Sequence, residues 1–291
     1  NCGLIRHTIW PSSVRRFLAS NQTYCRNIAA HQQSLNQLST FMTNNKIQRP
    51  VKAIILSAGQ GRRLLPLTEN TPKCLLLVAE KPVLAWQIDA LLAVGIDDIT
   101  IVAGFQVGLI EALLLRRYAD YPKIKVLFNP FFEVADNLAS CWIARTVMDS
   151  DFLLLNGDTV IESALLAQVL NSEAAPITLS VDYKDTYDAD DMKVQLDADG
   201  RVKQVSKIIP PHQVDAESIG LIYFREQGPS IFRRAIESAL RHPAELKSWY
   251  LSIIDALAKQ HLVNACSVQG FRWCEIDFIE DLAKAGIIFS D

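Results

Sequence analysis

A basic stretch punctuated by glycine is the part of this sequence best suited to chemistry. Residues 57–77 read SAGQGRRLLPLTENTPKCLLL and follow a short apolar run at residues 51–56. Gly59 and Gly61 allow the backbone to turn sharply and to approach a ligand closely. Backbone N–H groups in such a loop form a nest for anions, and basic side chains suit phosphate oxygens. The stretch therefore predicts a loop that binds a nucleoside triphosphate, with positive charges from Arg62, Arg63 and Lys73.

Two other phosphate-binding motifs do not fit this loop. A P-loop requires G-x-x-x-x-G-K-[ST], and a dinucleotide fingerprint requires G-x-G-x-x-G, whereas position 64 here is leucine. Kinase-like and dehydrogenase chemistry are therefore disfavoured. The A-G-x-G core alone is weak evidence, because a glycine turn in a solvated basic loop would look the same. The prediction gains strength from the ordered residues Arg63, Pro66, Thr68, Pro72 and Lys73.

Two aspartates stand where a divalent cation could be held beside such a loop. Asp158 directly follows the apolar segment DFLLLN, and so lies at the carboxyl end of a predicted strand, where open α/β sheets bind ligands. Asp277 ends the segment WCEID, again between a strand and a helix. Mg²⁺ prefers hard oxygen ligands of this kind. Either aspartate alone could be a helix cap. Glu275 is expected to point away from the metal in an extended segment. It would then be structural or would support the metal ligands from behind.

The elements that must position these groups alternate between strand and helix from residue 49 onward. This order predicts a three-layer α/β fold whose central sheet is mostly parallel, followed by a lobe rich in strands. The expected strands are 51–56, 98–103, 124–128, 151–155, 177–183, 192–196, 201–207, 219–224 and 262–268. The expected helices are 82–95, 107–119, 137–148, 229–241, 248–259 and 278–285, with residues 197–200 as a hairpin connection.

Composition is that of one large domain, since 49% of the 291 residues are hydrophobic and 21% are charged. No apolar run approaches the roughly 18–20 residues that span a bilayer, so membrane insertion is not expected. The six cysteines show no C-x-x-C pair or metal-like spacing and are interpreted as reduced thiols of a cytoplasmic protein.

Charge is distributed unevenly along the chain. The first 50 residues hold six of the 29 basic residues and no acidic one, which leaves 23 basic and 32 acidic residues for the remainder. Such an acidic body does not suggest nucleic-acid binding. Residues 1–49 are interpreted as an extension that is disordered or not needed for function, and residues 50–291 as the functional domain. A composition rich in serine and poor in acids also suits an organellar transit peptide, but upstream sequence or a tail is preferred for residues 1–41.

The pattern L-S-A-G-x-G-x-R-L-x-P-L-T-x-x-x-P-K at residues 56–73 resembles the signature of nucleotidyltransferases with a sugar-nucleotide-pyrophosphorylase fold. Within that superfamily the chain looks closest to the branch of phosphocholine and phosphonate cytidylyltransferases, over about residues 50–291. The family often has a small hydroxyl residue where this chain has Arg62, which makes the loop more basic. The resemblance implies a Rossmann-like nucleotidyltransferase fold, Mg²⁺ as cofactor, and transfer of a nucleotidyl group from a triphosphate to an acceptor phosphate.

The resemblance also implies roles for individual residues on the nucleotide side. Arg63 and Lys73 would contact the triphosphate as catalytic residues, and Asp158 and Asp277 would carry the metal. Gly104 matches a position where the base or ribose approaches the backbone, although a plain glycine at a strand end is an equal alternative. The remaining residues expected to surround the nucleotide are Leu56, Ser57, Ala58, Gly59, Gln60, Gly61 and Asp158.

Acceptor recognition is predicted for a second group of residues. Asn137 and Ser140 resemble the Asn-x-x-Ser segment of the choline-type branch, but Asn137 could simply cap a helix. Lys207 resembles a lysine of the family that contacts the acceptor phosphate. A quaternary ammonium would favour an aromatic cage, and a primary ammonium would favour a carboxylate, so the acceptor is left open. The full set is Asp136, Asn137, Ser140, Trp142, Lys193, Lys207 and Glu217.

The preferred function is therefore transfer of CMP from CTP to a small phosphorylated or phosphonylated alcohol or amine, such as phosphocholine or 2-aminoethylphosphonate. One alternative in the same fold is a sugar-1-phosphate nucleotidyltransferase that uses UTP or dTTP. Another, of a different class, is a protein that senses a nucleotide without turnover, which would have no need of a metal-binding pair of carboxylates. The sequence leaves the oligomeric state open.

Overall fold

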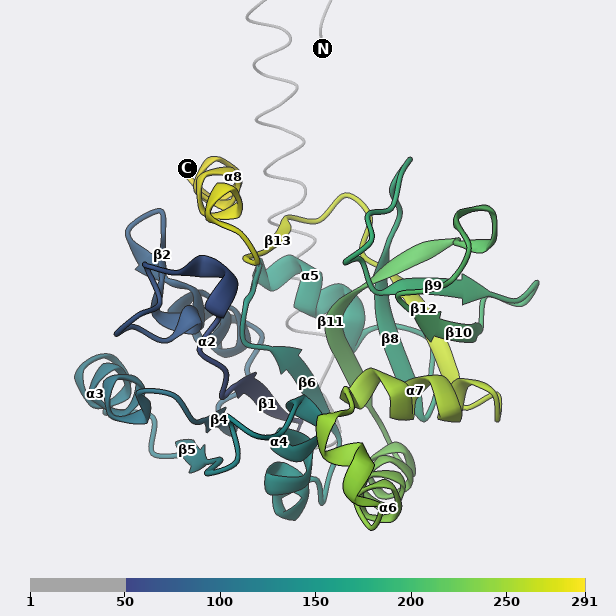
Figure 1. Ribbon diagram of the computed structural model, residues 1–291, viewed down its shortest axis with the longest axis horizontal. Coiled ribbons are helices and arrows are strands. Elements are labelled where there is room, and N and C mark those ends of the chain that lie inside the picture. The colour runs from purple at the N-terminus through teal and green to yellow at the C-terminus, as the bar shows by residue number, and fades with distance from the viewer. Residues whose placement is uncertain (1–50, 291) are drawn as a thin grey trace, which may run out of the picture. The chain divides into compact units, whose positions relative to one another are not determined.

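The structure is a computed structural model that describes residues 51–290. The predictions for the N-terminal extension at residues 1–49 lie outside these residues. A nine-stranded sheet runs through the described part (Figure 1). Its strands are β1 (Lys52–Ser57), β4 (Ile99–Ala103), β5 (Ile124–Phe128), β6 (Phe152–Asn156), β8 (Ile177–Asp182), β9 (Lys193–Leu196), β10 (Val202–Ser206), β11 (Ala216–Phe224) and β12 (Val263–Ser267).

Two small sheets and seven α-helices complete the secondary structure of the described residues, apart from short 3-10 turns. The small sheets pair β2 (Leu77–Val78) with β3 (Lys81–Pro82), and β7 (Thr159–Ile161) with β13 (Trp273–Glu275). The helices are α2 (Val83–Ala93), α3 (Val107–Arg117), α4 (Asn137–Ala144), α5 (Ser163–Leu170), α6 (Gly228–Ala239), α7 (Tyr250–Ala258) and α8 (Ile279–Phe289).

The large sheet has a parallel half and a mixed half. Strands β5, β4, β1 and β6 lie side by side and all run parallel. Strand β11 pairs antiparallel with β6 and with β8 on opposite edges, and its first residues, Ala216 and Glu217, also pair antiparallel with β9. Only β10 and β11 run against the remaining strands of this sheet, so the sheet is mostly parallel. The buried strand β11 therefore joins the parallel half to the lobe made of β8, β9, β10 and β12.

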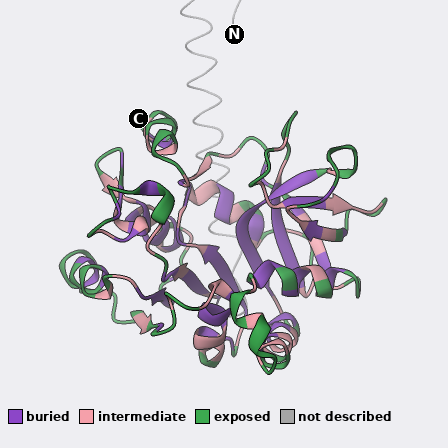
Figure 2. Ribbon diagram, in the orientation of Figure 1, coloured by how far each residue is buried: buried purple, intermediate pink, exposed green. Residues whose placement is uncertain are grey.

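Helices cover both faces of the sheet because its central strands are apolar on both sides. In β1, Ile54 and Ile55 are both fully buried and enter different core clusters. Helices α2, α3 and α5 pack on the face of Ile55, and helices α4, α6 and α7 pack on the face of Ile54. Figure 2 shows the buried strands between more exposed helices. The arrangement confirms the predicted three-layer α/β fold.

Most differences from the predicted elements concern short or mixed segments. The helix expected at 137–148 ends at Ala144 and continues as a 3-10 turn over Arg145–Val147. Helix α5 was not predicted. The pair β7 and β13 was not predicted either, since each strand has only three residues and shows no alternation long enough to read from sequence. The hairpin expected at residues 197–200 does connect β9 to β10.

Helix α8 and the small sheets form a third hydrophobic cluster. Its buried members come from the basic loop, from β2, from β7 and from α8: Leu64, Leu76, Val78, Val83, Val160, Ile276, Ala285 and Phe289. The end of the chain is thereby packed against the loop that follows β1. Among the described residues, no helix combines the length and the apolar character needed to cross a membrane.

Phe232 on α6 tests how strongly the helical layer supports the sheet. It is fully buried and stacks on Phe224 of β11, with ring centroids 4.5 Å apart. Phe232→Ala is expected to lower the free energy of unfolding by about 3–5 kcal/mol, because it removes buried apolar area and leaves a cavity. Leu115→Ala is the control, since that side chain is 77% exposed and should change stability by less than about 0.5 kcal/mol. Urea denaturation that gave equal effects for the two variants would contradict this account of the core.

Candidate active site

The loop after β1 is held in place by the segment that follows it. Gly61 has a φ of 78°, and a Cβ on it would lie 2.8 Å from the Cβ of Lys73. The buried Thr68 hydroxyl donates to the carbonyl of Gly61 at 2.8 Å. The Gln60 amide donates to the carbonyl of Thr68 at 3.1 Å. Glycine is therefore required at position 61 for both conformation and space, and Lys73 lies directly against the loop.

Lys73 is the centre of the site. Its Nζ lies 2.8 Å from Oδ2 of Asp158 and 2.6 Å from Oδ1 of Asp277. Asp158 precedes β7 and Asp277 follows β13, and these two strands pair with Thr159 opposite Glu275. The N–H of Ile276 also donates to the carbonyl of Asp158 at 3.0 Å. The small β7–β13 sheet therefore brings the two aspartates together, as expected for a pair that serves one ion.

The position of Glu275 contradicts one prediction. Its carboxylate supplies an oxygen to a cluster with Asp158 and Asp277 in which the three ligand atoms lie within 4.8 Å of one another. The expectation that Glu275 points away was wrong, because residues two apart on an extended segment lie on the same face. The acidic cluster thus has three members. The signal was present in the spacing of Glu275 and Asp277.

The electrostatics of this cluster depend on Lys73. Burial opposes its charge, but Asp158 and Asp277 outweigh burial and raise the pKa of Lys73 well above its usual value. Burial, together with the charges of Asp158 and Asp277, raises the pKa of Glu275. The site therefore holds a permanently protonated lysine among carboxylates that repel one another.

The residues present fit a divalent cation. The buried Oδ1 of Asp158 has no hydrogen-bond partner in the described part of the chain, so an acceptor atom is left available inside the acidic cluster. Carboxylate oxygens are the ligands that Mg²⁺ prefers, usually with few ligands from protein and several waters. Asp158 and Asp277, with Glu275 beside them, are the residues that would hold it.

Gly157 explains how Asp158 comes so close to the loop. A Cβ on Gly157 would lie 2.2 Å from Oγ of Ser57 and 2.5 Å from the carbonyl oxygen of Leu56. The N–H of Gly157 donates to that same carbonyl at 2.9 Å. No side chain fits there, so glycine is needed for the turn after β6 to pack against the end of β1. Gly157 was not among the predicted site residues, although it directly precedes Asp158.

Arg63 extends the site toward the strand-rich lobe. Its Nη1 lies 3.5 Å from Oδ2 of Asp277 and 3.3 Å from Oδ2 of Asp190. Asp190 in turn accepts from Nζ of Lys207 at 3.5 Å. That ammonium lies 4.6 Å from the ring centroid of Trp249. Arg63 and Lys207, both predicted for phosphate contacts, are thus linked through one carboxylate.

The segment at the start of α4 makes structural contacts. Oδ1 of Asp136 accepts from the N–H of Asn137 at 2.8 Å and caps α4. Its Oδ2 accepts from the indole of Trp249, also at 2.8 Å. Oδ1 of Asn137 accepts from the N–H of Tyr250 at 2.9 Å. These bonds connect α4 to the start of α7, and Trp249 links Asp136 to the Lys207 side of the site.

Three other residues predicted to bind the acceptor are buried and already form hydrogen bonds or an ion pair within the protein. The hydroxyl of Ser140 accepts from the side-chain amide of Asn129 at 3.0 Å. The ammonium of Lys193 donates to backbone carbonyls of residues 188, 191 and 207. Glu217 forms an ion pair with Lys184 at 2.6 Å. Lys193 and Glu217 thus have partners inside the strand-rich lobe, and Ser140 has one beside α4, while their contact with the acceptor stays a prediction.

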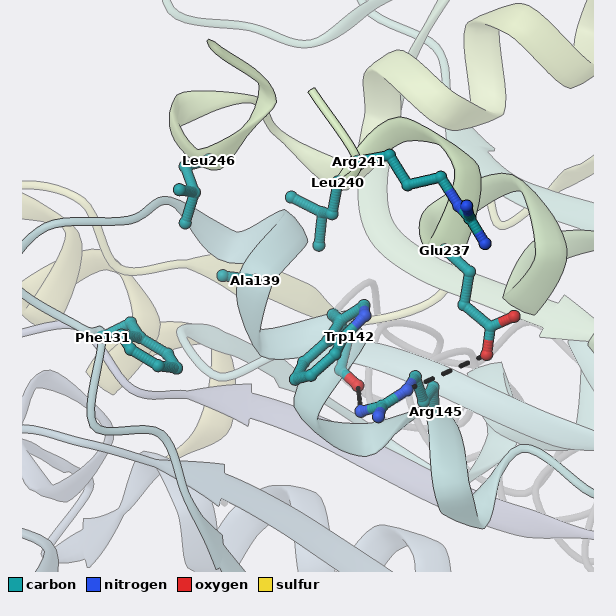
Figure 3. Close-up of a pocket in the computed structure, with 8 residues that line it drawn as sticks. All are labelled: Phe131, Ala139, Trp142, Arg145, Glu237, Leu240, Arg241 and Leu246. Atoms are coloured by element: carbon teal, nitrogen blue, oxygen red, sulfur yellow. Dashed lines mark hydrogen bonds and ion pairs between the residues drawn. The ribbon is translucent and has the colours of Figure 1, made fainter. Parts of the chain in front are cut away.

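Trp142 lies in a pocket apart from the acidic cluster, and Gly104 is closely packed by its neighbours. Trp142 lines a pocket of about 550 Å³ between α4 and α6, and the guanidinium of Arg145 stacks on its ring at 3.5 Å from the centroid (Figure 3). None of the residues that line this pocket belongs to the acidic cluster. A Cβ on Gly104 would meet the Cβ of Phe132 at 2.5 Å and the carbonyl oxygen of Ala58 at 2.8 Å, which suits a glycine required by packing.

A smaller hollow adjoins the loop itself. Its volume is about 210 Å³, and its lining consists of Gln60, Arg62, Phe132 and Glu133. Two of these residues belong to the loop predicted to bind the nucleotide. The hollow therefore lies beside the backbone predicted to bind phosphate, on the side of the loop that carries Gln60 and Arg62.

Comparison with known proteins defines the class of this protein. A nucleotidyl transferase family model matches residues 52–286, which is most of the chain, so the chain belongs to the nucleotidyl transferase family. This finding agrees with the resemblance carried by residues 56–73.

Two relatives and one solved structure show more specifically what this chain is similar to. The chain is 29% identical over 268 residues to CMP-5'-(3-aminopropyl)phosphonate synthase of Streptomyces rubellomurinus, which covers 88% of this chain but only 41% of the relative's length. It is 26% identical over 257 residues to CTP:phosphoglutamine cytidylyltransferase of Campylobacter jejuni, covering 80% of this chain and 98% of that protein. The fold is similar to that of CTP:phosphocholine cytidylyltransferase from Streptococcus pneumoniae, with a TM-score of 0.67 and 24% identity over 83% of this chain and all of that one.

The ion pair between buried Glu217 and exposed Lys184 generates a pH-dependent prediction. Burial raises the pKa of Glu217 from 4.5 to about 7, even though Lys184 opposes the rise. The folded protein keeps a proton on Glu217 that the unfolded chain has already lost, so this contribution to stability falls as pH rises from about 5 to about 7 and is constant above. Glu217→Gln lacks this term. Urea denaturation should show the variant gaining stability relative to the wild type over that range, and a difference that does not vary with pH would contradict the prediction.

Proposed function

We propose that this chain transfers CMP from CTP to a small phosphorylated or phosphonylated alcohol or amine and releases pyrophosphate. The observation that carries the proposal is the convergence of Lys73, Asp158 and Asp277 beside the glycine loop. The choice of CTP and of the acceptor class is supported by the relatives, which are named for a CMP-phosphonate product and for cytidylyl transfer to phosphoglutamine.

The nucleotide side of the site is formed by the end of β1 and the loop after it. Arg63 lies between the triphosphate and the acceptor, beside both Asp277 and Asp190, and Lys73 reaches the triphosphate or the departing pyrophosphate. Gly104 shapes the site through its packing against Phe132 and Ala58. The backbone and side chains that surround the nucleotide are those of Leu56, Ser57, Ala58, Gly59, Gln60, Gly61 and Asp158.

The reaction requires that the triphosphate and the acceptor phosphate be positioned and that their negative charges be neutralised. An oxygen of the acceptor phosphate attacks the α-phosphorus, and the bond from that phosphorus to the bridging oxygen of pyrophosphate breaks. Burial opposes the charge of Lys73, but Asp158 and Asp277 raise its pKa, so this residue brings a positive charge to the site. Mg²⁺ held by Asp158 and Asp277 would supply further neutralisation of the triphosphate.

The acceptor side of the site is the strand-rich lobe together with the start of α7. Lys207 offers its ammonium to the acceptor's anionic group, and the face of Trp249, which is 40% exposed, lies beside it. A cationic head group could meet this aromatic face. Asp136 fixes the indole through its hydrogen bond. Asn137, Ser140, Lys193 and Glu217 support the walls through the contacts described above.

A substrate screen tests the reaction. The full chain is incubated with Mg²⁺, with each of CTP, UTP, dTTP, ATP and GTP, and with a panel of acceptors that includes phosphocholine, 2-aminoethylphosphonate and sugar 1-phosphates. Release of pyrophosphate only with CTP and a phosphorylated or phosphonylated amine or alcohol supports the proposal. Turnover with UTP or dTTP and a sugar 1-phosphate would replace it with the sugar-nucleotide alternative, and nucleotide binding without turnover would replace it with a sensing role.

The two aspartates of the cluster give the sharpest mutational test. Asp158→Asn and Asp277→Asn are each expected to lower kcat by about a hundredfold to a thousandfold, because charge stabilisation of the transition state is lost, while nucleotide binding through the loop partly survives. Asp120→Asn, on the exposed surface after α3, is the matched control and should leave the rate unchanged. Wild-type rates in either cluster variant, measured by pyrophosphate release, would remove that residue from the metal site.

A further inference from the structure

The carboxylate of Asp190 contacts two basic residues on opposite sides of the site, Arg63 and Lys207. The proposed function assigns a role to this bridge. We propose that the Asp190 carboxylate occupies, in the empty protein, the place of the acceptor's phosphate or phosphonate group. The acceptor must then displace this carboxylate in order to bind. The inference rests on the proposed function and assigns to Asp190 the role of an internal competitor that sets acceptor affinity.

The geometry of the bridge is that of an anion site already filled. Asp190 Oδ1 lies 3.4 Å from Nη2 of Arg63 and 3.5 Å from Nζ of Lys207, while Oδ2 lies 3.3 Å from Nη1 of Arg63. Both carboxylate oxygens thus face one guanidinium, as the oxygens of a phosphate or phosphonate do in a two-point contact with arginine. The ammonium of Lys207 completes the set from the other side.

The two cations come from separate parts of the fold. Arg63 belongs to the 3-10 turn just after the glycine loop, and Lys207 directly follows β10 in the strand-rich lobe. An acceptor phosphate that attacks a bound nucleotide must lie between the nucleotide loop and this lobe. The place held by Asp190 is therefore the place where that anion has to be.

Asp190 is also free to leave. Its side chain is 49% exposed, and within residues 51–290 its carboxylate contacts Arg63 and Lys207 alone. The backbone around it is held independently, because Lys193 donates to the carbonyls of Asp188 and Asp191 and the side chain of Asp191 accepts from the N–H of Asp188. A rotation of the Asp190 side chain suffices to vacate the site, with the loop left in place.

A direct role for Asp190 in binding the acceptor's ammonium group predicts a different result for an anion that carries no amine. In that case removal of the Asp190 charge would leave the affinity for such an anion at the wild-type value, whereas removal of a competitor raises it. Binding of an anion without an amine therefore separates the two roles. Exposed ion pairs contribute little to stability, so the competition is worth a modest factor in affinity.

The test uses the full chain and methylphosphonate, a minimal anion without an amine or a nucleotide. Isothermal calorimetry should show that Asp190→Asn binds methylphosphonate roughly two- to fivefold more tightly than the wild type. Asp188→Asn is the control for net charge, since this exposed residue lies in the same loop and its carboxylate forms no ion pair with any described residue. Its affinity should stay at the wild-type value.

Several outcomes overturn the inference. Unchanged or weaker methylphosphonate binding in Asp190→Asn, binding too weak to detect in that variant, or an equal gain in Asp188→Asn would each do so. A gain that persists in the double variant Asp190→Asn with Lys207→Met would also count against it, because the vacated anion site would lack one of its cations. The nucleotidyl-transfer assay is run separately, so a gain in methylphosphonate affinity without CMP transfer would refute the proposed function and leave the occupied anion site standing.

Discussion

The structure depends on one electrostatic constraint: three carboxylates share a small volume, and a largely buried lysine, Lys73, offsets their negative charge. The ligand oxygens of Asp158, Glu275 and Asp277 lie within 4.8 Å of one another. Without a cation, such a cluster would repel itself and shift toward protonation. Lys73 supplies the positive charge in the empty protein, at 2.8 Å and 2.6 Å from the two aspartates. A divalent ion and a triphosphate would then enter a site whose charges are already arranged.

The fold satisfies this constraint with residues that are remote in the chain. Lys73 and Asp277 are 204 positions apart, and they meet because β7 and β13 form their own small sheet at the end of β6. The glycine loop approaches from β1, which pairs with β6 in the parallel half. Gly157 permits the last step of this approach, since a Cβ would collide with Ser57 and with the carbonyl of Leu56. The parallel pairing of β1 with β6 thus aligns the ends of these two strands. The absence of a side chain at Gly157 then lets the turn after β6 contact the end of β1.

The sequence was informative where a residue type is tied to a local requirement. Gly61, Lys73, Asp158 and Asp277 could be found because a glycine loop and aspartates after strands carry their own signal. The acceptor residues were harder, because the partners of a polar side chain are decided by distant segments: Lys193 donates to carbonyls of its own lobe, and Trp142 stacks with Arg145 in a separate pocket. The three-residue strands β7 and β13 were missed for the same reason, since their pairing and not their composition makes them strands.

The packing of helix α8 connects it to the basic loop and to the acidic cluster. It shares a cluster with Leu64 of the basic loop, with Val160 of β7 and with Ile276, the neighbour of Asp277. The side chain of Asp281 in its first turn also accepts from the N–H of Asp277 at 3.0 Å. A change in the packing of α8 would therefore be transmitted to Asp277 and to the basic loop without altering any carboxylate of the acidic cluster.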